Sequence, residues 1–187
     1  PGSFDFSAGN LTFSGDISGS GATFVKNVDN TKTMTLSGNN SGFTGIWSAS
    51  KGTLRFASPD AGSPNGTWIM GHNGAVLDFG GGTIHLGALS SSTEWAKILP
   101  AVNSGNYTIV VGEKNVDSTF TAQINQGTGN SIGLEKRGTA VQTLANAVSS
   151  YRGGTTVKGG ILSAMIIADD WVNSSIGQTG SLVLDGG

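Results

Sequence analysis

The chain has 187 residues, of which 31 are glycine and none is cysteine. This composition excludes disulfides and thiolate metal sites, and 36% apolar residues are enough to bury a core. Only 12% of the residues are charged and the net charge is -2, which argues against nucleic acid as a partner. No apolar run approaches the roughly 18 residues of a membrane helix, so we expect no membrane insertion.

Short apolar stretches alternate with Gly, Asn, Ser and Asp along the whole chain. Helical periodicity is weak, and only residues 93–99 and 139–148 have enough of it to form a helical turn or two. The sequence therefore predicts an all-β protein with little helix. The predicted strands are residues 11–13, 34–36, 53–56, 75–77, 108–111, 160–162 and 182–184.

The chain also repeats itself. Residues 35–56 align without gaps with residues 143–164, at an offset of 108. About six of the 22 pairs are identical, among them Gly52 with Gly160, and an aromatic residue stands at the same place in both copies. Two copies of one long unit are typical of a stacked repeat architecture.

The second copy carries a recognisable motif. The stretch from Tyr151 to Ser163 (YRGGTTVKGGILS) resembles the autotransporter-associated β-strand repeat, whose pattern runs from an aromatic residue through Gly-Gly-Thr-Thr-Val to Gly-Gly and Leu. The first copy departs from this pattern at residues 46–49 (IWSA). The resemblance implies a single-stranded, right-handed parallel β-helix. Residues 88–106 and 165–176 depart from the repeat.

Physical reasoning agrees with this resemblance. A strand with one apolar row cannot bury that row alone, so successive coils stack and share backbone hydrogen bonds. At roughly 20 to 25 residues per coil, the chain makes about eight coils. We interpret residues 4–187 as one β-helix domain with two long units, about 11–87 and 120–187. Residues 1–3 are typical of a cloning scar.

The charged residues give no support for catalysis. Asp169 and Asp170 are the only adjacent carboxylates, and in consecutive strand positions they would point to opposite faces, whereas a glycosidase needs two carboxyl groups across one sugar. We expect them to be solvated turn carboxylates. His72 and His85 lack ligand spacing, so we expect turn or surface histidines and no metal site. A calcium ion at a turn has no support, and no cofactor is expected.

The aromatic residues fall into two groups. Trp47 and Trp68 have the parity of inward-facing repeat positions, so we expect both in the core. Phe43 and Tyr151 occupy the aromatic position of the repeat and are predicted to be packing residues. Trp95 and Trp171 lie in the two segments that depart from the repeat.

Insertions on a solenoid project from one face, which is often the binding face. An indole beside hydrogen-bonding side chains suits a sugar, because a pyranose has an apolar face and polar edges. We therefore predict a ligand site that consists of Trp95, Trp171, Glu94, Lys97, Asp169, Asp170 and Asn173. The alternative is that each of the two indoles only holds a loop against the rod or caps an end.

The favoured function is a noncatalytic carbohydrate-binding module for a plant cell-wall polysaccharide. The fold is similar to β-helical modules attached to polysaccharide hydrolases, which implies xylan as the ligand class and a covalently linked catalytic domain as a partner. The first alternative is a fragment of an autotransporter passenger, an adhesin or a stalk. The second is a β-helical polysaccharide hydrolase or lyase. The resemblance implies a secreted or cell-surface bacterial protein.

Overall fold

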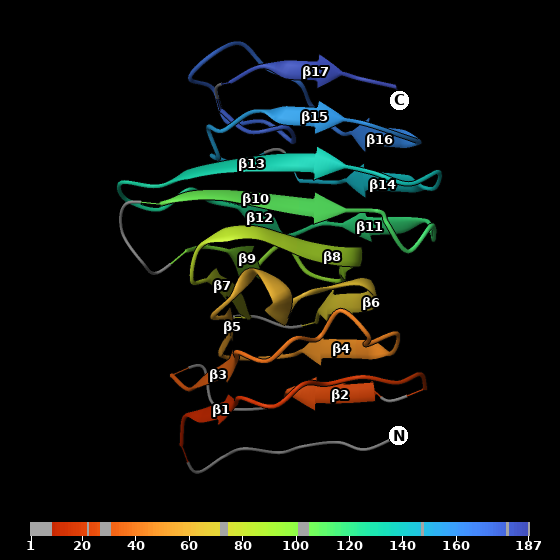
Figure 1. Ribbon diagram of the computed structural model, residues 1–187. Coiled ribbons are helices and arrows are strands. Elements are labelled where there is room, and N and C mark those ends of the chain that lie inside the picture. The colour runs from red at the N-terminus through yellow and green to blue at the C-terminus, as the bar shows by residue number, and fades with distance from the viewer. Residues whose placement is uncertain are drawn as a thin grey trace.

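Strands stack along one axis from the N-terminal to the C-terminal end of the chain (Figure 1). The computed structural model describes residues 9–21, 23–26, 31–71, 75–100, 105–146, 148–178 and 180–186. Neighbouring strands pair in parallel throughout the described ladders, and the coils amount to about seven turns of a β-solenoid. The predicted all-β solenoid is confirmed, with a turn number close to the expected eight.

The strands of the described residues form three sheets. The first has the order β1 (Leu11–Phe13), β3 (Thr33–Leu36), β5 (Thr53–Phe56), β7 (Val76–Phe79), β9 (Lys97–Ile98) and β12 (Gln123–Ile124). The second has the order β2 (Thr23–Lys26), β4 (Ile46–Ala49), β6 (Ser63–Met70), β8 (Gly82–Ser91), β10 (Asn106–Val111), β13 (Ser131–Lys136), β15 (Thr155–Val157) and β17 (Leu182–Leu184). The third has the order β11 (Ser118–Phe120), β14 (Val141–Leu144) and β16 (Ile161–Ala164).

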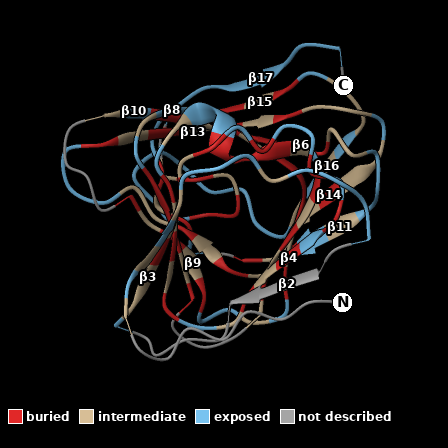
Figure 2. Cartoon of the chain, turned by 60° about the horizontal axis from the view of Figure 1, so that its bottom comes forward, coloured by how far each residue is buried: buried red, intermediate tan, exposed pale blue. Residues whose placement is uncertain are grey.

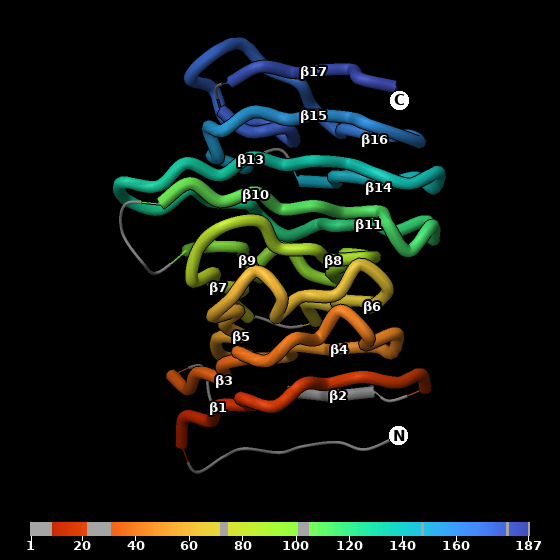
Figure 3. Tube along the Cα trace, viewed as in Figure 1, coloured from red at the N-terminus to blue at the C-terminus, as the bar shows by residue number. Residues whose placement is uncertain are grey.

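Consecutive strands of the chain belong to different sheets, and each coil adds one strand to a sheet before the next coil begins. Residues about one coil apart in the sequence are therefore stacked on one another (Figure 3). The seven predicted strands all lie in or overlap strands of the structure. The prediction of a helical turn or two at residues 93–99 and 139–148 is wrong. Residues 93–99 form a turn and β9, and residues 139–148 contain β14. Within the described residues, the helical structure is one short 3-10 segment, Pro59–Ala61.

Buried residues lie along the strands that enclose the interior of the rod (Figure 2). Buried aromatic side chains gather in the N-terminal half of this interior. Phe56 lies edge-on to Trp68 with ring centroids 5.0 Å apart, and Trp47 stacks on Trp68 at 6.2 Å. Trp47 and Trp68 are each 2% exposed, and the predicted packing residues Phe43 and Tyr151 are also buried. All four predictions of buried aromatic residues are therefore confirmed.

Polar side chains at the corners join one coil to the next. Asn115 Oδ1 accepts a hydrogen bond from the Thr139 backbone N–H at 2.7 Å, and Asp117 Oδ1 accepts one from the Val141 N–H at 2.8 Å. Backbone N–H groups that leave the ladder at a corner must find another acceptor. Short Asn and Asp side chains supply it, which explains why these residues bound the strands in the sequence.

Strand β8 pairs with a neighbouring strand on each side of the eight-stranded sheet. Its first half pairs with β10, and its second half, residues 88–91, pairs with β6. A Cβ on Gly87 would lie 2.1 Å from the Pro64 carbonyl oxygen, so only glycine fits where β8 passes β6. Residues 88–91 are thus part of a regular coil. Residues 97–98 likewise pair in β9, so the expectation that 88–106 is an insertion is wrong for these two stretches, and Trp95 lies on the turn between β8 and β9.

Candidate functional site

Trp95 lies on the turn between β8 and β9. Its backbone N–H donates to Thr93 Oγ1 at 3.2 Å, and the next residue, Ala96, is 1% exposed and anchors the turn in the core. The Trp95 side chain is 68% exposed. The turn therefore holds a large apolar ring at the surface of the rod, as the sequence predicted for this residue.

A groove opens beside this ring. Its volume is about 440 Å³, within the range of about 300 to 1,000 Å³ that is typical of small-ligand sites. The lining residues come from three successive coils and are Ser92, Thr93, Glu94, Trp95, Thr121 and Ala145.

Hydrogen bonds between successive coils fix the distant members of this lining. The Thr121 N–H donates to Ser91 Oγ at 2.7 Å, and Thr121 Oγ1 donates to the Ser91 carbonyl at 3.1 Å. The Ala145 N–H donates to the Phe120 carbonyl at 2.9 Å. Sequence reasoning missed Thr121 and Ala145, because only the stacking register places them next to Trp95.

Of the predicted site residues near Trp95, one joins the groove and one does not. Glu94 is exposed and lines the groove beside Trp95. Lys97 lies in β9, between Val76 and Gln123 of the neighbouring strands, and is half-buried outside the lining. The lining contains no residue of segment 165–176, so the two predicted indoles do not form one groove.

Trp171 has a different environment. Its backbone has a φ of 69°, its N–H donates to the Gln178 carbonyl at 2.8 Å, and Gln178 Nε2 donates back to the Trp171 carbonyl at 3.0 Å. The Arg152 guanidinium lies 5.2 Å from the ring centroid, close enough for a cation–π interaction. Trp171 is 67% exposed, yet these contacts favour a role in holding its loop against the rod.

The other predicted residues of this loop lie at the surface. Asp169, Asp170 and Asn173 are all exposed, and the Asp169 carbonyl accepts the Val172 N–H at 3.1 Å in a turn. The two carboxylates are therefore solvated turn residues, as expected. The part of this loop that the structure describes contains no strand.

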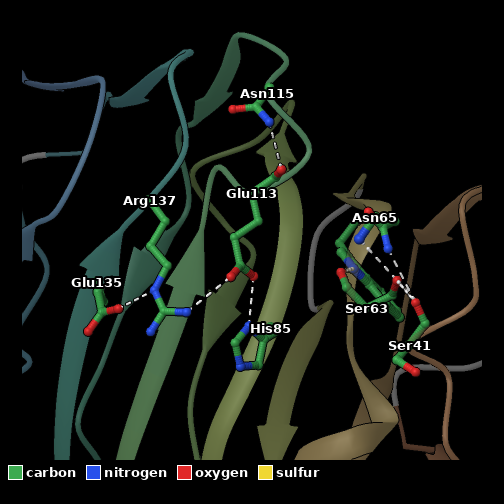
Figure 4. A network of polar contacts seen from close by, with 9 residues as sticks. Ser41, Ser63, Asn65, His85, Glu113, Asn115, Glu135 and Arg137 are labelled. Carbon is green, nitrogen blue, oxygen red and sulfur yellow. Dashed lines mark hydrogen bonds and ion pairs between the residues drawn. The ribbon is translucent and has the colours of Figure 1, made fainter.

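An ion-pair network crosses the outer side of β8, β13 and the turn after β10 (Figure 4). His85 Nδ1 lies 2.7 Å from Glu113 Oε2, and Arg137 Nη1 lies 3.2 Å from Glu113 Oε1. Arg137 also pairs with Glu135, which Lys158 contacts at 3.1 Å. His85 thus lies in a strand with its side chain partly exposed, which agrees with the predicted surface histidine, and it pairs with a carboxylate that the sequence did not predict. His72 lies outside the described residues.

The ion pairs of this network shift the pKa values of Glu135 and Arg137. Burial alone would raise the pKa of Glu135, but hydrogen bonds from Arg137 and Lys158 outweigh it and lower that pKa below its usual range. The hydrogen bond with Glu135 raises the pKa of Arg137. The network thus joins two cations, Arg137 and Lys158, to two carboxylates, Glu113 and Glu135.

The described residues contain no group of three His, Asp or Glu side chains placed to hold a metal ion. Among the same residues, no helix has the length and apolar character to cross a membrane.

Comparison with known proteins identifies two repeats. Residues 29–56 and 134–164 match the family described as the passenger-associated-transport-repeat. These segments contain the two copies found in the sequence, 35–56 and 143–164. The predicted resemblance to the autotransporter-associated repeat is therefore confirmed, and the chain carries two such repeats.

One relative extends the similarity over nearly the whole chain. The adhesin BmaC autotransporter of Brucella suis biovar 1 (strain 1330) is 33% identical over 181 residues, which are 95% of this chain. The matched region is 5% of the adhesin, so the chain spans a small part of the length of this relative. No solved structure matches the chain significantly.

Proposed function

We propose that this chain is a segment of an autotransporter passenger, which acts as a stiff β-solenoid spacer within a bacterial adhesin at the cell surface or after secretion. The observation that carries the proposal is the 33% identity to an adhesin autotransporter across 95% of the chain. The two passenger-associated-transport repeats support the same assignment.

The structure is suited to a spacer. Each coil pairs its backbone with the coils on either side, so stiffness arises from contacts between nearest neighbours. At the C-terminal end, β17 is exposed and large apolar side chains lie at the surface, among them Met165 at 66% and Leu184 at 72%. An apolar end of this kind favours packing against a further coil of the same solenoid.

The comparisons give less support to the other functions predicted from the sequence, a carbohydrate-binding module and a polysaccharide hydrolase or lyase. The comparisons favour the passenger alternative over a carbohydrate-binding module linked to a glycoside hydrolase, because the matched repeat and the adhesin both point to an autotransporter. Neither xylan as a ligand nor a linked catalytic domain gains support from them. A noncatalytic role agrees with the adhesin relative, and we propose no reaction.

Surface display tests the proposal. The chain would be placed between a secretion signal and an autotransporter β-domain in a Gram-negative host, and exposure measured with an antibody and added protease on intact cells. We expect efficient display and slow cleavage within the solenoid. The matched control replaces residues 134–164 by a Gly/Ser linker of equal length, which should lower display or speed cleavage. Retention inside the cell, or equal behaviour of the control, would contradict the proposal.

A further inference from the structure

We infer that the groove beside Trp95 is a binding site for a neutral pyranose sugar of a glycan chain. This inference goes beyond the spacer role, because it assigns a ligand contact to one corner of the rod. It depends only on the geometry of the groove, so it holds whether or not the chain is a passenger segment.

Trp95 differs from the other three tryptophans in the surroundings of its ring. Trp47 and Trp68 are 2% exposed in the core, and Trp171 is 67% exposed but has the Arg152 guanidinium 5.2 Å from its ring centroid. Trp95 is 68% exposed and forms one wall of the groove. An exposed indole that borders a groove offers an apolar platform for a ligand, and the C–H face of a pyranose is complementary to such a ring.

The other walls supply hydrogen-bonding groups and space. Ser92 Oγ donates to the Gly71 carbonyl at 3.2 Å and keeps its lone pairs to accept from a ligand hydroxyl. Glu94 offers carboxylate acceptors at the rim. Ala145, two coils above Trp95, contributes only a methyl group and leaves the groove open. An aromatic wall with hydroxyl and carboxylate partners matches the apolar face and the hydroxyl edge of a sugar.

The charge of the lining residues limits which sugars the groove can bind. Glu94 is the charged residue of the lining, and its carboxylate would repel the carboxylate of a uronic acid. The coils above Trp95 contribute Thr121 and Ala145, both uncharged. The site therefore favours a neutral sugar over a polyuronate. Its open, wet geometry predicts weak affinity, because water bridges persist and flexible hydroxyls must be ordered.

Calorimetric titration of the whole chain with xylohexaose, cellohexaose, mannohexaose and chitohexaose tests the inference, with oligogalacturonate as the acidic comparison. We expect at least one neutral oligosaccharide to bind more tightly than oligogalacturonate. Trp95→Ala should weaken that binding at least tenfold, and Ala145→Leu should weaken it by filling the groove. Trp171→Ala is the matched control and should change the affinity less than twofold. Glu94→Gln should improve oligogalacturonate binding.

Circular dichroism of each variant checks that the fold is retained, which is expected because Trp95 lies at the surface. The inference is overturned if none of the neutral oligosaccharides binds, or if Trp171→Ala abolishes binding while Trp95→Ala does not. Binding of a peptide ligand in the groove, without sugar binding, overturns it as well. Failure here leaves the surface display experiment unaffected, so the two proposals are tested separately.

Discussion

Gly52 and Gly160 occupy equivalent positions of the two repeats and adopt the same left-handed backbone conformation, with φ angles of 67° and 66°. Each stands directly before a strand, β5 or β16. Glycine reaches this conformation without the steric penalty that a Cβ imposes. The repeat thus preserves a turn geometry, and this geometry has a measurable energetic consequence.

Gly160→Ala should destabilise the chain by more than the roughly 1 to 2 kcal/mol of left-handed strain. The added Cβ would lie 2.6 Å from the Gly138 carbonyl oxygen and 2.7 Å from that of Ala140, so a coil must also shift. Urea unfolding measures the loss. Gly15→Ala is the control, since its Cβ meets no atom within 4 Å. Equal stability of both variants would refute the expected strain.

Phe56→Ala should remove a central part of the aromatic interior and cost about 3 to 5 kcal/mol. Phe56 is fully buried, and its ring centroid lies 5.0 Å from that of Trp68 and 5.8 Å from that of Phe79. Because each coil contacts only its neighbours, the loss should be local. Hydrogen exchange should show reduced protection in β3 to β7 and unchanged protection in β13. Uniform loss along the rod would contradict this description.

Lys136→Met should destabilise the corner after β13. The Lys136 side chain is fully buried, and its ammonium donates to the carbonyls of Arg137, Gly138 and Gly159. Methionine leaves these partly buried acceptors without that donor, at up to about 1 to 3 kcal/mol for an unsatisfied group. Lys158→Met removes an exposed lysine from its ion pair with Glu135 and should cost less than about 1 kcal/mol. Thermal unfolding of both variants checks the contrast.

The ion-pair network should stabilise the chain in a pH-dependent way. The pKa of Glu135 is lowered from its ordinary value of 4.5 in the folded chain. Its contribution is therefore present above about pH 4.5 and is lost as the pH falls through the lowered pKa. Glu135→Gln should reduce stability at pH 7 and converge with the parent chain in strong acid.

Denaturant midpoints measured between pH 2 and 7 give this comparison. Glu94→Gln changes an exposed carboxylate on the Trp95 turn and should leave the pH profile unaltered. A constant difference between Glu135→Gln and the parent chain at every pH would show that the ion pairs do not contribute through the charge of Glu135.

The two repeats show how far sequence reasoning reaches. Strands β3 and β14 begin at residues 33 and 141, which preserves the offset of the aligned copies. Yet β3 lies in the six-stranded sheet and β14 in the three-stranded one, while β4 and β15 share the eight-stranded sheet. Equivalent sequence therefore occupies different sheets. The glycine turn before β5 and β16 is the same in both copies, but the sheet that each strand joins depends on the coils stacked against it.

The candidate site likewise combines features that the sequence predicted with features that only the structure shows. Exposure of Trp95 followed from its departure from the repeat, and burial of Trp47 and Trp68 followed from strand parity. The separation of Trp171 from the Trp95 groove did not follow from the sequence, because the spatial distance between two loops depends on the coil register. The pairing of His85 with Glu113 also joins residues 28 positions apart that no motif connects.

The sequence by itself determined that this protein is all-β, because alternating apolar residues and turn-forming glycines are local signals, and the resemblance of residues 151–163 to the autotransporter-associated repeat implied the stack of parallel strands. It also determined the repeated unit and the interior aromatic residues. Only the tertiary structure decided which coils lie above one another, and therefore that Thr121 and Ala145 border the groove beside Trp95 while the Arg152 guanidinium contacts the ring of Trp171. Such neighbours are set by the length and bend of each coil, which sum over many residues and leave no short motif.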